Sequence, residues 1–321
     1  MKKLILIFIF FSINLFSMEN YNIENLDIKI DIKNDGSINI EKKILYNIKD
    51  INGIFYKIDT VGFGKLKNLE IYYEDNDRNI LKKAREGSYL DNGTYNIGQN
   101  NGIYKIILNT PAKNIKKEFI FRYTLTKGVN VYQDIAQFNR KIVSDDWDKR
   151  IHHITAKIIF PTEIKRNRIK AFGHGSLEEK IDFINNNEIL YTLQNYSPGD
   201  FLEANIIFPK EVIKNIKSED INPENMYQKV IMFEKKKEIA NVKRRDLAIH
   251  KEYLMQTFLI FGIIFWIALM LMIYLKNNKR HKKKININQK LTITDLDFDI
   301  NPAIMGTIIS RKTLHPPTAI M

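Results

Sequence analysis

The sequence predicts a mainly β protein: an exported antiparallel β-sandwich, followed by a charged helical stalk and one transmembrane helix. Three observations predict this class. Before residue 210, hydrophobic and polar residues alternate over many short segments, Gly, Asn and Asp turns separate these segments, and one long apolar segment follows later in the chain. With 321 residues, 44% of them hydrophobic, the chain can bury one sizeable core.

The first 17 residues, MKKLILIFIFFSINLFS, have the pattern of a signal peptide, because two lysines precede an apolar run that ends at a small residue. The apolar run is too short to span a bilayer comfortably. We therefore expect residues 1–17 to direct export, and residues 18–210 to form the exported β-domain. Whether the signal segment is cleaved stays open.

The alternation is clearest in residues 26–33, where Leu and Ile occupy every second position and charged residues the positions between them. Asn34-Asp35-Gly36-Ser37 then predicts a hairpin turn. Two later segments, ITAKIIFP (residues 154–161) and LEANIIFP (residues 202–209), are similar strands, each ended by a proline that cannot continue a ladder. Their similarity leaves open whether the domain contains two β-subdomains.

After residue 210 the composition changes. Residues 226–253 are rich in Lys and Glu and lack Gly and Pro, which favours a charged helical stalk over residues 211–253. A solvated linker with fluctuating helix is the alternative. Residues 254–275 carry no charge and are numerous enough to cross the hydrocarbon layer as a helix.

The distribution of charge predicts topology. Residues 226–290 hold 15 lysines and arginines against 4 acidic residues, which accounts for most of the chain's net charge of +13. The basic run that follows the apolar segment predicts that residues 276–321 lie in the cytoplasm and that the β-domain lies outside. Charge placed beside a span indicates contact with the lipid membrane and does not indicate nucleic-acid binding. The absence of cysteine excludes disulfides and thiol catalysis.

The segment SDDWDKRIHH, residues 144–153, concentrates side chains that could form a site. If a strand begins at residue 151, the adjacent His152 and His153 point to opposite faces, so they cannot bind one metal together. We expect a structural corner in which Trp147 packs, aspartates stabilise turns and His153 faces water. The candidate binding residues are Asp145, Asp146, Trp147, His152 and, from AFGHGS, His174.

The alternative to a structural corner is a metal-assisted hydrolase that uses Asp146, His152 and His174 together. No nucleophile elbow, zinc-protease motif or phosphate-binding loop occurs in the chain. The sequence therefore predicts no catalytic residue, cofactor or metal site, and favours a non-enzymatic envelope protein whose exported domain binds a ligand or other envelope proteins.

The order of several motifs resembles the YciQ-like predicted membrane proteins, a bacterial family whose exported N-terminal domain has no known function. The resemblance covers about residues 21–320 and implies no catalytic residues. The chain departs from that family by ending early in its cytoplasmic part, and by having Phe138-Asn139 where the family has an aromatic pair. The motifs are the turn DGS, NGIFYKID, SDDW, ITAKIIFP, AFGHGS, LEANIIFP and the single span.

Overall fold

The structure is a computed structural model, and it describes residues 20–291 except 76–79, 89–90 and 177–178. The expected signal peptide (residues 1–17) and the expected tail beyond residue 291 lie outside the described residues. The chain divides into two compact units, residues 1–243 and 244–321, and each is described by itself. The fold is mainly β, with two sheets and a C-terminal helix, as the sequence predicts.

The alternating segment forms strand β1 (Tyr21–Ile32), which is joined to β2 (Ile38–Asp59) by the predicted hairpin turn. Gly36 adopts a positive φ of 79°, which favours glycine, and Asp35 accepts hydrogen bonds from the backbone and hydroxyl of Ser37. The Leu and Ile side chains at positions 26, 28, 30 and 32 are at most 2% exposed. The period-two pattern therefore places this face in the core, as predicted.

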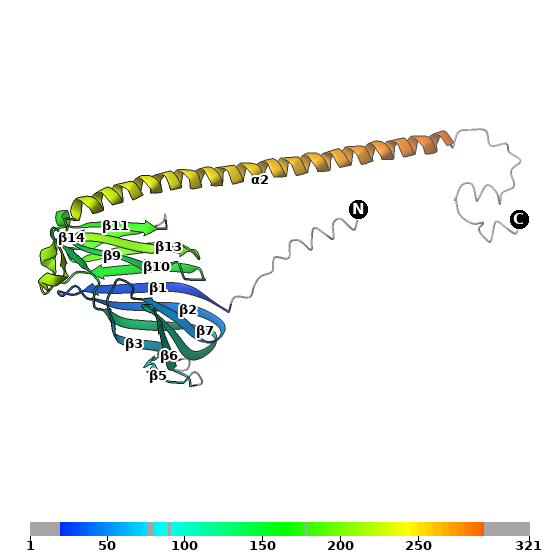
Figure 1. Cartoon of the computed structure of the whole chain (residues 1–321). Helices are drawn as coiled ribbons and strands as arrows, with labels where there is room; N and C mark the ends of the chain where they lie inside the picture. Colours follow the sequence, from blue (N-terminus) through cyan, green and yellow to red (C-terminus); the bar gives the residue numbers. More distant parts are fainter. Residues whose placement is uncertain (1–19, 76–79, 89–90, 177–178, 292–321) are drawn as a thin grey trace, which may run out of the picture. The chain divides into compact units, whose positions relative to one another are not determined.

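The larger sheet has ten strands, most of them in the order β12-β13-β10-β1-β2-β7-β3-β4, with β5 and β6 attached through β7 (Figure 1). Most neighbours are antiparallel, as predicted, but β1 pairs with β10 in parallel. A parallel pair needs a long crossover, which residues 33–150 supply. The further strands are β3 (Leu66–Glu74), β4 (Leu81–Lys83), β5 (Arg85–Glu86), β6 (Thr94–Asn100), β7 (Ile103–Leu125), β10 (Ile151–Ile159), β12 (Lys180–Asn185) and β13 (Glu188–Tyr196).

The smaller sheet has five strands in the order β11-β14-β9-β8-β15. Its central strand, β9, comes from a segment between two strands of the larger sheet, so the chain passes from one sheet to the other and back. Residues 136–143 are therefore placed opposite the β1–β2 hairpin. The strands are β8 (Asn130–Tyr132), β9 (Ala136–Val143), β11 (Lys170–Gly175), β14 (Leu202–Phe208) and β15 (Ile221–Asn222).

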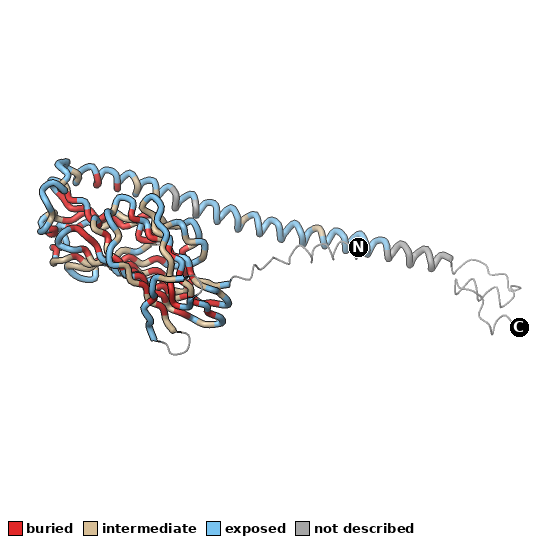
Figure 2. Tube along the Cα trace, turned by 60° about the horizontal axis from the view of Figure 1, so that its bottom comes forward, coloured by how far each residue is buried: buried red, intermediate tan, exposed pale blue. Residues whose placement is uncertain are grey.

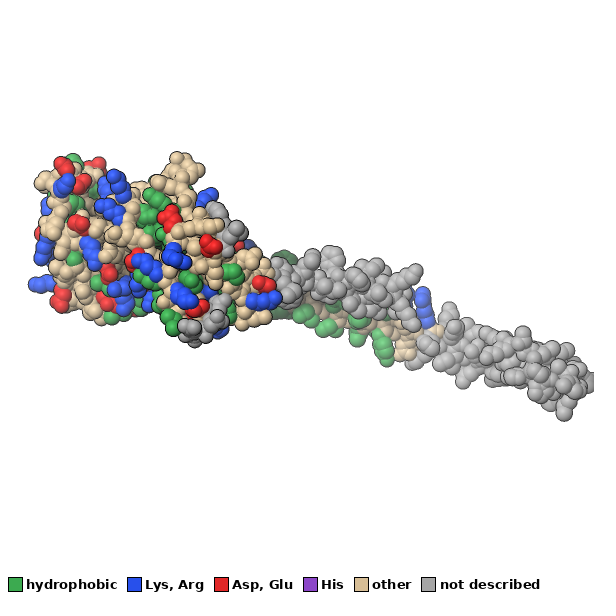
Figure 3. Space-filling view, turned by 90° about the horizontal axis from the view of Figure 1, so that it is seen from below, with side chains coloured by type: hydrophobic (Ala, Val, Ile, Leu, Met, Phe, Trp, Pro, Cys, Tyr) green, Lys and Arg blue, Asp and Glu red, His purple; other side chains and the backbone are tan. Residues whose placement is uncertain are grey.

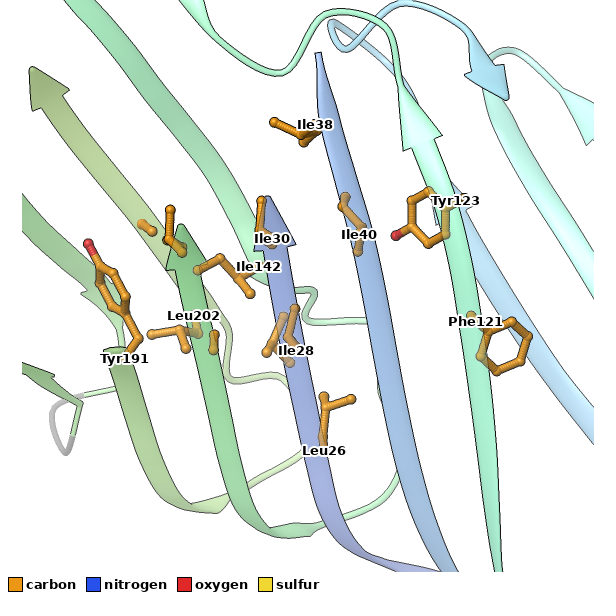
Figure 4. Close-up of a cluster of buried hydrophobic side chains, with 14 of the residues drawn as sticks. Leu26, Ile28, Ile30, Ile38, Ile40, Phe121, Tyr123, Ile142, Tyr191 and Leu202 are labelled. Carbon is orange, nitrogen blue, oxygen red and sulfur yellow. The ribbon is translucent and has the colours of Figure 1, made fainter. Parts of the chain in front are cut away.

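One hydrophobic core joins the two sheets. Figure 4 shows Ile142 of β9 beside Ile28 and Ile30 of β1, with Ile40 of β2 on the neighbouring strand. Figure 2 shows that the buried residues lie in these strands. Dispersion and the removal of apolar surface from water across this interface stabilise the fold.

The two similar segments noticed in the sequence become β10, in the larger sheet, and β14, in the smaller sheet. Their phenylalanines meet: the rings of Phe160 and Phe208 are 5.0 Å apart, edge to face. Each is followed by a proline, at which the strand has ended. The similarity thus has a physical role, because the two segments close the same region of one core from opposite sheets.

The region expected to form a helical stalk from residue 211 is not helical in its first part, up to residue 222, apart from short 3₁₀ turns. Residues 210–220 contain two short 3₁₀ turns, η2 (Lys210–Val212) and η3 (Ser218–Asp220), and β15 then pairs with β8. Helix α2 (Tyr227–Leu291) begins after this pairing. The expectation was wrong here because Val212 and Ile213 are buried in the core. Tertiary packing determines this burial, and the local composition does not reveal it.

The start of α2 belongs to the first unit. The carboxylate of Asp134 accepts the backbone amides of Met226 and Tyr227 at 2.8 and 3.0 Å, and so caps the helix from a loop distant in sequence. Val230 packs against Ile135 and Ile207 on the outer face of the smaller sheet. These contacts attach the first turns of α2 to the β-domain.

The later part of α2 contains a candidate membrane span, Ile249–Arg280, with a mean hydropathy of 2.7. It includes the predicted transmembrane residues 254–275, and its most apolar part has no residue buried against the protein (Figure 2). Figure 3 shows basic and acidic side chains interspersed on one face of the β-domain.

Candidate functional site

A cavity of about 630 Å³ opens between the two sheets, next to the corner at residues 144–148. Strands β1, β2 and β7 of the larger sheet line one side, and β9 of the smaller sheet lines the other. The volume is within the range of pockets that bind small organic molecules. The cavity is therefore a candidate ligand site formed where the sheets separate.

Three of the five predicted binding residues, Asp145, Asp146 and Trp147, line this cavity. Trp147 is partly buried and packs against the core cluster, as the corner interpretation expected. His153, which was expected to face water, is partly exposed, and its Nδ1 lies 2.6 Å from Nε2 of Gln194 in an exposed pair. This contact follows from strand register, since His153 pairs directly with Gln194 on β13.

The two remaining candidates lie elsewhere. His152 is exposed, whereas His174 is buried on β11 with its Nε2 2.8 Å from a carboxylate oxygen of Glu234 in α2. Asp146 pairs with Lys57. Among the residues that the structure describes, no three His, Asp or Glu side chains form a group that could hold a metal ion. The composite site of Asp146, His152 and His174 is therefore not assembled.

The exposure of His152 has a local cause. The sequence pattern placed His152 on the face of Ile154, and Ile154 is indeed fully buried, but so is Ile151. Ile23 and Asn25 of β1 pair with Ile151 and His153, and the ladder between β1 and β2 has a register shift between these two β1 residues. Side-chain alternation is interrupted at such an irregularity, and on β10 the buried position is odd at Ile151 and even from Ile154 onward.

The rim of the cavity carries matched charges. Lys57 Nζ lies 2.7 Å from Asp146 Oδ2, and Lys141 Nζ lies 3.1 Å from Asp145 Oδ1. The hydrogen bond from Lys57, offset in part by burial, and a further bond to Ser144 lower the pKa of Asp146. Each of these two aspartates thus has a lysine at ion-pair distance.

Deeper in the cavity, two cations face it from opposite sheets: Lys42 on β2 and Arg140 on β9. Lys42 Nζ donates to the carbonyl of Ile142 at 3.1 Å, and Arg140 Nη2 donates to the carbonyl of Asp59 at 3.1 Å. The guanidinium also lies 4.0 Å from the ring centroid of Phe63. Within the described part of the chain, neither cation has a carboxylate at ion-pair distance.

Burial strongly perturbs both groups. Desolvation, together with the positive charge of Arg140, lowers the pKa of Lys42 to about 7, and desolvation also lowers the pKa of Arg140. Nη1 of Arg140 is buried and has no partner at normal hydrogen-bond geometry among the described residues. Such strongly perturbed groups in a cleft are typical of functional sites.

Aromatic side chains form the wall beside these cations. Tyr56 stacks on Phe121 with ring centroids 3.8 Å apart, and Tyr123 lies on the same sheet face. Burial raises the pKa of both Tyr56 and Tyr123, so their hydroxyls stay neutral at physiological pH. The wall thus combines apolar ring surface with neutral polar tips.

Sequence reasoning missed Lys42 and Arg140, although a signal for each was present. In INIEKKILYNI, Lys42 occupies the position between Ile40 and Ile44 on the inward face. In AQFNRKIV, Arg140 occupies the same kind of position between Phe138 and Ile142. A charged residue at an inward position of an alternating strand is costly, and it therefore marks a candidate site.

Comparison with known proteins identifies the family. The model of a family described as the N-terminal domain of a predicted membrane protein, DUF2207, matches residues 22–208. The chain belongs to this family. The DUF2207 match runs from β1 to the end of β14 and includes nearly all of the cavity, and it agrees with the resemblance to YciQ-like membrane proteins. No curated protein matches the chain.

Three solved structures resemble this DUF2207 protein distantly. A provisionally assigned protease from Parabacteroides distasonis is 12% identical, with a TM-score of 0.37 over 58% of this chain and 40% of that one. A provisionally assigned nutrient-binding protein from Legionella pneumophila is 8% identical, with a TM-score of 0.37 over 59% and 68%. Yeast LTA4 hydrolase is 10% identical, with a TM-score of 0.38 over 59% and 29%. At these scores the similarities say nothing about activity.

Proposed function

We propose that this DUF2207 protein is a membrane-anchored envelope protein whose β-domain is exported and binds a ligand in the cavity between its sheets. The cavity itself is the observation that carries the proposal, because it combines a ligand-sized volume with aromatic walls and a few convergent polar groups. The domain acts by binding and not by catalysis. Its neighbours are the lipid membrane and, as candidate partners, other envelope proteins.

The proposed location is the cytoplasmic membrane, crossed once after removal of the signal segment, with the β-domain outside and the residues after the span in the cytoplasm. It rests on the candidate span and on the basic residues that follow it, such as Lys276 and Lys279.

The orientation has a direct test, because the chain contains no cysteine. Lys214, exposed in the β-domain, and Lys279, exposed after the apolar segment, are each replaced by cysteine. In spheroplasts, a membrane-impermeant maleimide should label Lys214→Cys at once and Lys279→Cys only after lysis. The reverse labelling pattern would contradict the proposed topology.

Ligand binding can be followed through Trp147, which lines the cavity. The chain has two tryptophans, so Trp266→Phe leaves Trp147 as the only reporter. With the full chain in lipid nanodiscs, we expect the nitroaromatic quenchers 4-nitrobenzoate or 4-nitrobenzamide to quench Trp147 emission along a saturable curve. The chain with Trp147→Phe and Trp266 retained controls for partition into lipid, and its emission should be quenched without saturation. Linear, collisional quenching by both probes would contradict a ligand site.

The rival activity, hydrolysis, is measured on the same protein. We expect no release of nitrophenolate from 4-nitrophenyl phosphate or 4-nitrophenyl acetate above the rate with a denatured sample. Turnover that zinc or calcium restores after chelation would contradict the non-enzymatic proposal.

A further inference from the structure

Four basic residues and four aspartates line the cavity, but their charges are not evenly placed. At the corner, Asp145 and Asp146 each have a lysine, as Lys141–Asp145 and Lys57–Asp146, and Asp148 accepts a hydrogen bond from Tyr21. Lys42 donates to a main-chain carbonyl, and Arg140 donates to the carbonyl of Asp59, with the Tyr123 hydroxyl and the Asp59 carboxylate nearby. Among the described residues neither cation has a carboxylate at ion-pair distance, so positive charge without a direct ion pair is concentrated at Lys42 and Arg140.

This arrangement is costly unless something else offsets it. A buried charge without a partner destabilises the fold, and two like charges that face each other add repulsion. Lys42 and Arg140 also interrupt inward faces that are otherwise apolar, where an aliphatic side chain would pack without cost. Proteins retain such groups mainly where function requires them.

The buried lysine Lys117 differs from Lys42 in its surroundings. Lys117 is only 2% exposed, but its Nζ donates to Thr110 and lies over the rings of Tyr73 and Phe119. Burial lowers the pKa of Lys117 to about 8, but the ring faces and the nearby carboxylates of Asp75 and Glu74 favour its charge and partly offset the burial. Lys42 and Arg140 instead face an open cavity, with buried Nη1 of Arg140 unpartnered.

We propose that the cavity binds an amphiphilic anion, whose carboxylate or phosphate head lies between Lys42 and Arg140 and whose aromatic or apolar body lies against Tyr56 and Trp147. The inference rests on the proposed function and adds the chemical class of the ligand. An arginine recognises planar or tetrahedral oxyanions through paired hydrogen bonds, and the lysine adds a point charge from the opposite sheet. The head group supplies the missing counter-ion for both.

The test compares an acid with its neutral isostere by Trp147 quenching, in the full-length Trp266→Phe protein in nanodiscs. We expect 4-nitrobenzoate to bind at least tenfold more tightly than 4-nitrobenzamide. Lys42→Met and Arg140→Met should each remove this preference while leaving the affinity for the amide unchanged. Lys43→Met is the matched control, because Lys43 is the next residue on β2, points to the opposite face and pairs with Glu41. It should preserve the preference.

The outcomes separate the two levels of the proposal. If acid and amide bind with equal affinity, or if both Met variants keep the preference for the acid, the anion assignment is wrong while the cavity remains a ligand site. If neither probe gives saturable quenching, the proposed function itself fails. Should Arg140→Met not fold, Lys42→Met alone decides the anion assignment.

The anionic head group of the ligand could come from two sources, a soluble organic anion or a lipid. Short-chain dihexanoyl phosphatidylglycerol and dihexanoyl phosphatidylcholine are used as competitors of 4-nitrobenzoate. Competition by the anionic lipid alone assigns the site to a lipid phosphate. Competition by 4-nitrophenyl phosphate without competition by the anionic lipid assigns it to a soluble anion. Equal competition by both lipids would contradict recognition of a net anion.

Discussion

Lys42→Met is expected to stabilise the β-domain by about 2 kcal/mol at pH 6, and by much less at pH 10. Desolvation and the charge of Arg140 lower the pKa of Lys42 to about 7 in the folded protein. In the unfolded chain the pKa returns to about 10.4. Between these values the unfolded state binds more protons, so the stability of the wild-type protein rises with pH. The gain on substitution is therefore complete below pH 7 and disappears towards pH 10.4.

The expected gain is smaller than the full pKa shift implies, because Lys42 is only partly buried and its hydrogen bond to the Ile142 carbonyl is lost. Urea unfolding of the full chain in detergent, followed by Trp147 emission, gives the free energy at each pH, with Lys43→Met as control. A loss of stability at pH 6, or a gain independent of pH, would contradict an uncompensated charge.

Other titratable groups face the same cavity as Lys42. They are Tyr21, Tyr46, Tyr56, Lys57, Asp59, Tyr123, Arg140, Lys141, Asp145, Asp146 and Asp148.

Glu234→Ala is expected to destabilise the protein by about 3 kcal/mol. Glu234 is only 4% exposed, although it lies near the start of a charged helix. Its Oε1 accepts a hydrogen bond of 2.6 Å from Asn205, which in turn accepts one of 2.7 Å from Gln137. Its Oε2 lies 2.8 Å from Nε2 of His174. Removing the carboxylate leaves the Asn205 amide without its acceptor and removes the close contact with the His174 ring in a buried layer.

The measurement is urea unfolding combined with proteolysis of the segment between β15 and the apolar part of α2. Glu238→Ala, one turn later on the exposed side of α2, should change the free energy of unfolding by less than about 0.5 kcal/mol. Glu234→Ala should also make residues 227–243 sensitive to protease. If the two variants are equally stable and equally resistant, the start of α2 is not attached to the smaller sheet by this network.

Much of the fold could be predicted from local pattern. The alternation in residues 26–33 and the Asp35-Gly36 turn act through nearby residues, and both predictions are confirmed. The long uncharged segment forms a helix that is long and apolar enough to be a candidate membrane span. Residues 211–222 were predicted wrongly, because a short strand that pairs with β8 depends on contacts ninety residues away in the sequence. His174 was singled out for metal chemistry, yet its partner is Glu234 on a helix, which the sequence did not connect to it.

The candidate site was predictable only in part. The corner drew attention to Asp145, Asp146 and Trp147 because unusual residues are adjacent in the chain, and all three line the cavity. Lys42 and Arg140 are separated by nearly one hundred residues, and each is an ordinary basic residue in a basic chain. They line one cavity only because the chain crosses from one sheet to the other and places the two inward faces opposite each other.

The protonation of Lys42 tests the central claim, an electropositive ligand site between the sheets, most directly. Reductive ¹³C-methylation of the lysines, with Lys42→Arg to assign the signal, allows the titration of Lys42 to be followed by NMR in the full chain. We predict a midpoint near pH 7 that rises by more than one pH unit when 4-nitrobenzoate saturates the cavity and does not change with 4-nitrobenzamide. A midpoint near the ordinary value for lysine, unaffected by either compound, would contradict the account.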